Sequence, residues 1–133
     1  MKEKALNYYK NGSSCSESIV LAAADEGLCD KNLLPVATSF SAGMSSGCLC
    51  GAVAGAQLVL GANFGKSNLK GNEESARLMA KEFIEEFKAK RHTTCCRALS
   101  ANFDFNSPER KENCASLVKE CAEILEKLVK IKV

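Results

Sequence analysis

Apolar residues recur along most of the chain at the three- and four-residue spacing of one helical face. The clearest case follows Ser107 and Pro108, because Ser is favoured at a helix cap and Pro at the first helical position. The apolar positions of this last helix are Cys114, Leu117, Cys121, Ile124, Leu128 and Ile131. A second long amphipathic helix, capped by Asn72, carries Leu78, Met79, Phe83, Ile84 and Phe87.

The N-terminal part of the chain predicts three shorter helices. The first spans residues 2–10, and Asn11-Gly12 ends it. Ser14 and Glu17 form a capping-box pattern in front of the second helix, which Gly27 closes. A third helix is expected over residues 32–40, followed by a Gly/Ser-rich loop over residues 41–47.

A helix rich in small residues is predicted over residues 50–61. Gly51 and Gly55 lie four residues apart on one face of it, and each Gly costs roughly 1 kcal/mol of helix stability relative to Ala. The cost is explained if another backbone approaches this face closely. No segment is typical of a strand, so we expect an all-α fold: a compact bundle of about five to six helices, in one domain covering residues 1–133.

Composition and charge narrow the possible functions. The chain has 133 residues, 46% of them hydrophobic, which excludes wholesale disorder. The formal net charge is only +2 and the basic residues form no stripe, so neither a nucleic acid nor a polybasic membrane contact is expected. The N-terminus does not resemble a signal peptide, and no apolar stretch is long enough to span a membrane, so we expect a cytoplasmic protein.

The eight cysteines are the unusual feature of the composition. In a reducing compartment, many cysteines indicate metal binding or redox chemistry more often than disulfide staples. Cys50 gives the strongest signal, because backbone N–H groups at a helix start stabilise a thiolate. Cys48 lies two residues earlier, and Cys95 and Cys96 form an adjacent pair beside Arg97, whose charge could hold a thiolate.

The spacing of the cysteines excludes several common sites. The chain has no Cys-x-x-Cys, which zinc knuckles, c-type haem attachment and ferredoxin-type clusters use. Cys114 and Cys121 lie about 10 Å apart along one helix, so one small site is not expected to take both. Cys121 is expected in the core and Cys29 in a turn, while His92 is expected to cap a helix rather than bind a metal. Any shared site must be assembled by the fold from distant segments.

Four segments together resemble the C-GCAxxG-C-C family, whose members are described as redox-active. The first runs from Gly12 to Glu17, and the central signature combines residues 40–44 with Cys50-Gly51-Ala52-Val53-Ala54-Gly55. The last two are residues 96–99 and 114–118. The resemblance covers nearly the whole chain, in the right order.

The resemblance implies that the characteristic cysteines are Cys15, Cys50, Cys96 and Cys114. Cys48, Cys95, Cys29 and Cys121 are additional to the family pattern. Some members carry selenocysteine, and a similar domain in split-Soret cytochrome c accompanies a non-haem iron–sulfur centre. This chain has no haem-attachment motif, so only the iron–sulfur part could transfer.

Three hypotheses follow for the function. The first is an iron–sulfur protein whose cluster is held by Cys15, Cys50, Cys96 and Cys114, with Cys48 or Cys95 assisting, for electron transfer or cluster handling. The second is a metal-free thiol oxidoreductase with Cys50 as its catalytic nucleophile. The third is a zinc-binding module. A redox partner protein is expected. The apolar face of the last helix and the Gly/Ala face could each serve a homodimer, but an internal core explains both faces equally well.

Overall fold

The computed structural model describes the backbone of residues 1–132 and the side chains of residues 1–130. Within that range it contains seven α-helices and no strand, which confirms the all-α prediction with slightly more helices than expected. They are α1 (Lys2–Lys10), α2 (Cys15–Asp25), α3 (Leu34–Thr38), α4 (Gly51–Phe64), α5 (Glu74–Arg91), α6 (Cys96–Leu99) and α7 (Pro108–Lys132). Two further turns are η1 (Lys31–Leu33) and η2 (Gly43–Gly47).

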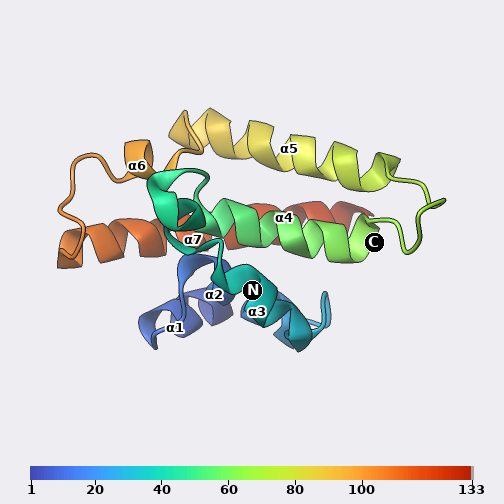
Figure 1. Ribbon diagram of the computed structural model, residues 1–133, viewed down its shortest axis with the longest axis horizontal. Coiled ribbons are helices and arrows are strands. Elements are labelled where there is room, and N and C mark those ends of the chain that lie inside the picture. Colours follow the sequence, from blue (N-terminus) through green and yellow to red (C-terminus); the bar gives the residue numbers. More distant parts are fainter. Residues whose placement is uncertain (133) are drawn as a thin grey trace.

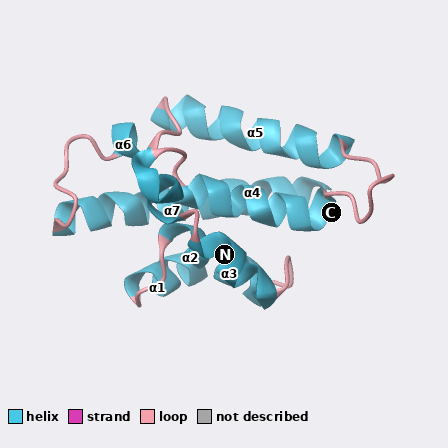
Figure 2. Cartoon of the chain, viewed as in Figure 1, coloured by secondary structure: helices cyan, strands magenta, loops and turns pink. Residues whose placement is uncertain are grey.

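The three longest helices form the body of the molecule. Figure 1 shows α4, α5 and α7 running along the long axis, with α1, α2 and α3 together on one side of them. Helix α4 contacts α2, α5 and α7, so it is the centre of the packing. Figure 2 shows that η2, α6 and the loops next to them gather at the end where α4 begins.

The small-residue face of α4 is closely approached, as predicted. A Cβ atom added to Gly55 would lie 2.7 Å from the carbonyl oxygen of Ser16, and one added to Gly51 would collide with the Cys15 thiol and lie 2.9 Å from the Phe40 carbonyl oxygen. Real side chains do not make such contacts, so the two glycines let the start of α2 lie directly against α4. This contact brings Cys15 beside the start of α4.

The predicted caps Ser14 and Ser107 are present, whereas the predicted cap Asn72 is wrong, because the cap residue of α5 is Glu73. Ser14 accepts a hydrogen bond from the Glu17 backbone N–H, and the Glu17 carboxylate accepts one from the Ser14 N–H, which completes the capping box. Ser107 accepts from the Arg110 N–H at the start of α7. Asn72 accepts from the Glu74 N–H, one residue outside the cap position of α5.

The apolar face of α7 packs into the core. Leu117, Cys121, Ile124 and Leu128 are all at most 4% exposed. The side chain of Ile131, also predicted on this face, lies outside the described residues. No helix in the described range is long and apolar enough to cross a membrane.

Candidate functional site

A short backbone pairing positions Cys50 and Cys96. Leu49 and Cys95 form an isolated antiparallel bridge, in which the Cys50 N–H donates to the Thr94 carbonyl (2.7 Å) and the Cys96 N–H donates to the Cys48 carbonyl (2.5 Å). Cys50 is then the cap residue of α4, and Cys96 is the first residue of α6. The pairing joins two segments that lie more than forty residues apart in the sequence.

A serine network holds Cys15 at the start of α2. The Ser41 hydroxyl donates to the Ser14 hydroxyl (2.7 Å), and the Ser16 hydroxyl donates to the Ala37 carbonyl (2.7 Å). These bonds tie the start of α2 to α3 and to the segment that follows α3. Cys15 lies between Ser14 and Ser16, so its thiol is held against Gly51.

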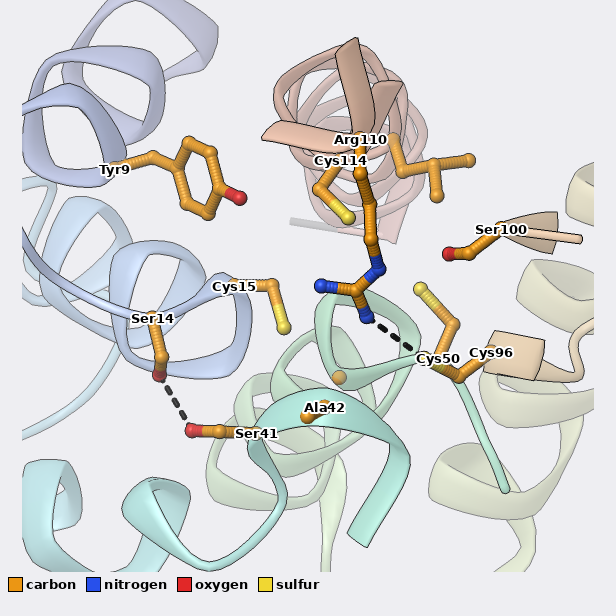
Figure 3. Close-up of a pocket in the computed structure, with 12 residues that line it drawn as sticks. Tyr9, Ser14, Cys15, Ser41, Ala42, Cys50, Cys96, Ser100, Arg110 and Cys114 are labelled. Atoms are coloured by element: carbon orange, nitrogen blue, oxygen red, sulfur yellow. Dashed lines mark hydrogen bonds between the residues drawn. The ribbon is translucent and has the colours of Figure 1, made fainter. Parts of the chain in front are cut away.

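Cys114 reaches the same region from the second turn of α7. Arg110, one turn earlier on the same face, directs its Nη2 atom toward the Cys96 sulfur at 3.9 Å. Figure 3 shows the thiols of Cys15 and Cys114 pointing into the space that the Arg110 side chain enters, with Tyr9 from α1 pointing toward the same space.

The four cysteines of the family pattern line one cavity. Its volume is about 170 Å³, and five elements contribute to its wall. Cys50 and Cys96 are 5% and 9% exposed, and Cys15 and Cys114 are half-buried. The remaining lining residues are Tyr9, Ser14, Ser41, Ala42, Gly51, Ser100, Arg110 and Leu117.

Burial dominates the protonation of these thiols. It raises the pKa of Cys50 to about 12, against the opposing effect of the Val53 and Ala52 backbone N–H groups. Burial also raises the pKa of Cys15, where the Ala42 N–H opposes it, and of Cys96, where Arg110 opposes it. The expectation of a stabilised Cys50 thiolate is therefore wrong for the metal-free chain: the donors are present, but the loss of water outweighs them.

The other four cysteines lie outside the cavity wall. Cys48 is exposed, and the Cys95 thiol donates to the Gly47 carbonyl at 3.6 Å, so both flank the cavity without lining it. Cys121 is fully buried in the core, as predicted. The Cys29 thiol donates to the Val20 carbonyl in the turn after α2.

The sequence predicts that Arg97 holds a nearby thiolate by its charge and that His92 caps a helix. Arg97 does not contact the neighbouring cysteines by hydrogen bond in the described residues; it donates to the Ser46 carbonyl at 3.1 Å, and Arg110 takes the place beside Cys96. His92 is the left-handed C-terminal cap of α5, with φ of 70°, and does not line the cavity.

Arg110, Tyr9 and Ser100 are site residues that the sequence analysis missed. Arg110 could have been found, because it precedes Cys114 by four residues and therefore shares its helical face. Tyr9 and Ser100 carry no such signal, since only the packing of α1 and α6 brings them to the cavity.

The turn that closes the cavity has an unusual backbone. Four consecutive residues are left-handed: Ala42, Gly43, Met44 and Ser45 have φ values of 53°, 64°, 61° and 56°. The left-handed conformation is costly for residues other than Gly, and residues that adopt it concentrate at functional sites. The turn carries the Ala42 N–H that faces the Cys15 thiol. The predicted loop over residues 41–47 is thus a constrained turn.

No group of three or more His, Cys, Asp or Glu residues in the described part of the chain is gathered closely enough to hold a metal ion. The four thiols of the cavity are soft ligands of the type that both zinc and iron–sulfur clusters take.

A comparison with known protein families shows which family the chain belongs to. The family model described as "Putative redox-active protein (C_GCAxxG_C_C)" matches residues 13–128. The chain belongs to the C_GCAxxG_C_C family. The match includes all four cavity cysteines, and the resemblance expected from the sequence is confirmed. Searches of curated proteins and of solved structures gave no match. The family description makes this chain a redox-active type of protein and assigns no cofactor or substrate.

Proposed function

We propose that this C_GCAxxG_C_C protein is a redox protein that binds an iron–sulfur cluster through Cys15, Cys50, Cys96 and Cys114. The observation that carries the proposal is that four cysteines from four separate segments line one cavity of about 170 Å³. Thiolates are the usual ligands of such clusters, and a bound cluster would supply one-electron transfer.

The surroundings suit a negatively charged centre. Cys15 is the first residue of an eleven-residue helix and Cys50 caps a fourteen-residue helix, so two positive helix ends face the cavity. Arg110 adds a full positive charge beside Cys96. These groups favour the deprotonated state that metal binding requires, whereas burial alone keeps the empty thiols protonated.

The chain's own residues would also shield the centre. Leu117, Gly51 and Ala42 supply apolar walls, which limit water access and lower the local dielectric constant. Arg110 and backbone N–H groups near the sulfurs are the features that raise a cluster's reduction potential. Electron transfer to a partner protein, with the cavity end of the molecule facing it, is the role that we assign.

Iron and sulfide analysis tests this proposal. The protein purified without oxygen should contain iron and acid-labile sulfide and should absorb visible light through sulfur-to-iron charge transfer. A colourless protein without iron or sulfide would contradict the proposal. If it instead contained zinc alone, the zinc-module hypothesis would replace it.

Metal-free thiol–disulfide exchange is the second hypothesis, and it needs an accessible nucleophile. Cys50 is 5% exposed and its pKa is raised, so it is poorly suited to attack a disulfide in the metal-free chain. Alkylation of the reduced protein separates the two hypotheses: rapid modification of Cys50 at neutral pH would favour thiol exchange.

A further inference from the structure

A second, larger hollow adjoins the thiol cavity. It has a volume of about 630 Å³, within the range of small-molecule sites. Ala42, Cys96, Ser100 and Arg110 line both spaces, so the hollow opens beside the cysteines rather than elsewhere on the surface. We call it the arginine cleft, after Arg97 and Arg110 in its wall.

The charge of the arginine cleft is positive and uncompensated. No Asp or Glu lies among its described lining residues, and neither arginine forms an ion pair with a carboxylate in the described part of the chain. Arg97 uses one donor on the Ser46 carbonyl, which leaves other guanidinium N–H groups for a ligand. Two such guanidinium groups on one concave wall attract and bind oxyanions.

Each guanidinium is held in place. Arg110 donates to the Phe105 carbonyl, and its charged group lies 4.6 Å from the centre of the Phe105 ring. Arg97 packs against Gly47, where an added Cβ atom would lie 3.2 Å from its Nε atom. Gly47 has φ of 72°, a conformation that favours Gly, and a side chain there would push the Arg97 guanidinium out of its place. Ordered guanidinium groups lose less entropy when a ligand binds.

Ser100 supplies an independent indication of a ligand. Its side chain is only 9% exposed, and its hydroxyl is the one buried side-chain polar atom without a hydrogen-bond partner among the described residues. Buried polar atoms are nearly always paired. In Figure 3 this hydroxyl points toward Arg110, which lines both the thiol cavity and the arginine cleft. A hydrogen-bonding group in the space between cavity and cleft would satisfy it.

The remaining wall is apolar. Phe103, Phe105 and Ala101 face the arginine cleft together with Ala42, and Phe105 is 68% exposed. A bare inorganic anion would leave these aromatic surfaces and most of the volume unused. A ligand with an oxyanion headgroup and an apolar or aromatic body would use both the charge and the wall.

We propose that the arginine cleft binds a small organic anion, with its carboxylate or phosphate headgroup between Arg97 and Arg110, within reach of Ser100, and its apolar body on Phe103 and Phe105. The cleft is thus a binding site beside the thiol cavity. The binding of this anion does not rest on the proposed function.

Calorimetric titration of the protein with benzoate tests the binding. Benzyl alcohol, which has the same ring and no charge, and inorganic phosphate, which has charge and no ring, are the matched probes. Benzoate should bind saturably and more tightly than either, and its affinity should fall as salt is added. Equal affinity for benzoate and benzyl alcohol, or no saturable binding of benzoate, would overturn the proposal. Phosphate binding as tightly as benzoate would overturn the organic class of ligand.

Two variants and one control locate the site. Arg97→Gln should weaken benzoate binding by about tenfold or more, because a charge-assisted contact is lost, and Ser100→Ala should weaken it by a smaller factor. Arg77→Gln removes the same charge from an exposed position on α5 and should leave binding unchanged. If Arg97→Gln and Arg77→Gln bind benzoate alike, or if Ser100→Ala binds it as tightly as the unaltered chain, the assignment is overturned.

These titrations remain informative if the protein carries no cluster. The metal content of each sample is measured separately, so a chain that binds benzoate without iron would support the arginine cleft while contradicting the proposed function. A chain with iron and no benzoate binding would do the reverse.

Discussion

At Gly43 the backbone is left-handed and surrounded by other atoms. An added Cβ atom would lie 2.6 Å from both the Cys48 nitrogen and the Cys96 Cβ atom. Gly43 therefore lets the η2 turn lie against the two segments that carry the site cysteines. At Gly12 the φ angle is also positive, at 109°, but the space around it is open. Substitutions at Gly12 and Gly43 can therefore distinguish the cost of a strained backbone alone from the cost of strain together with a steric clash.

Gly43→Ala should destabilise the fold more than Gly12→Ala does. A left-handed conformation costs a residue with a Cβ atom roughly 1–2 kcal/mol, and only Gly43→Ala adds a backbone clash to a strained φ. Urea unfolding followed by circular dichroism measures both free energies of unfolding. Equal losses would show that the η2 turn relaxes away from Cys48 and Cys96.

Ser14 is the residue whose polar contacts both start α2 and fix the position of Cys15. Its hydroxyl accepts from the Glu17 N–H and from the Ser41 hydroxyl. Ser13, its neighbour, has no side-chain hydrogen bond in the described residues and is a matched control.

Ser14→Ala should lower the free energy of unfolding by about 1 kcal/mol, the usual cost of losing an N-cap, and Ser13→Ala should change it little. Ser14→Ala should also make Cys15 more accessible to alkylation, since the tie to Ser41 is lost. If Ser14→Ala had the same free energy of unfolding as the unaltered chain, water would fully replace the hydrogen bond between the Glu17 N–H and the Ser14 hydroxyl.

At the scale of the helices, α4 decides how closely the cysteine segments meet. Its Gly51 and Gly55 face α2, whereas Gly61, on the same helix, has open space around it. The close approach was predictable, because two glycines on one helical face lower helix stability unless a closely packed neighbour offsets the loss. The partner was not predictable, since nothing in the sequence names α2 as the neighbour.

Gly51→Ala and Gly61→Ala should change stability in opposite directions. Gly61→Ala should stabilise the protein by up to about 1 kcal/mol through helix propensity. Gly51→Ala should destabilise it, because the new methyl group collides with the Cys15 thiol and the Phe40 carbonyl. Thermal or urea unfolding checks both. If Gly51→Ala were also stabilising, α2 and α4 would not pack as described.

The elements that could not be predicted are those set by long-range pairing. The Leu49–Cys95 bridge joins two cysteine segments through backbone hydrogen bonds, which carry no side-chain signal in the sequence. The left-handed stretch at η2 has Ala42 at its cap and Met44 and Ser45 within it, where Gly would be expected, so its conformation is imposed by its surroundings. Helices with periodic apolar faces, such as α5 and α7, were predicted because their signal is local.

At the scale of the whole molecule, the fold sorts eight cysteines into two sets. Four line one cavity, and the other four lie in the core, in a turn or beside the cavity. The family pattern identified the first set, whereas composition alone gave only their number. The pKa direction at Cys50 was predicted wrongly because helix-end donors were visible in the sequence and the depth of burial was not.

Iron content across a cysteine series tests the central claim, that four distant cysteines form one cluster site. Each of Cys15→Ser, Cys50→Ser, Cys96→Ser and Cys114→Ser is purified without oxygen beside Cys29→Ser, a control from a turn outside the cavity. Circular dichroism confirms that each variant is helical. The account predicts bound iron and sulfide in the unaltered chain and in Cys29→Ser, and a marked loss in each of the four cavity variants. Iron unchanged in those four folded variants, or absent from the unaltered chain, would contradict it.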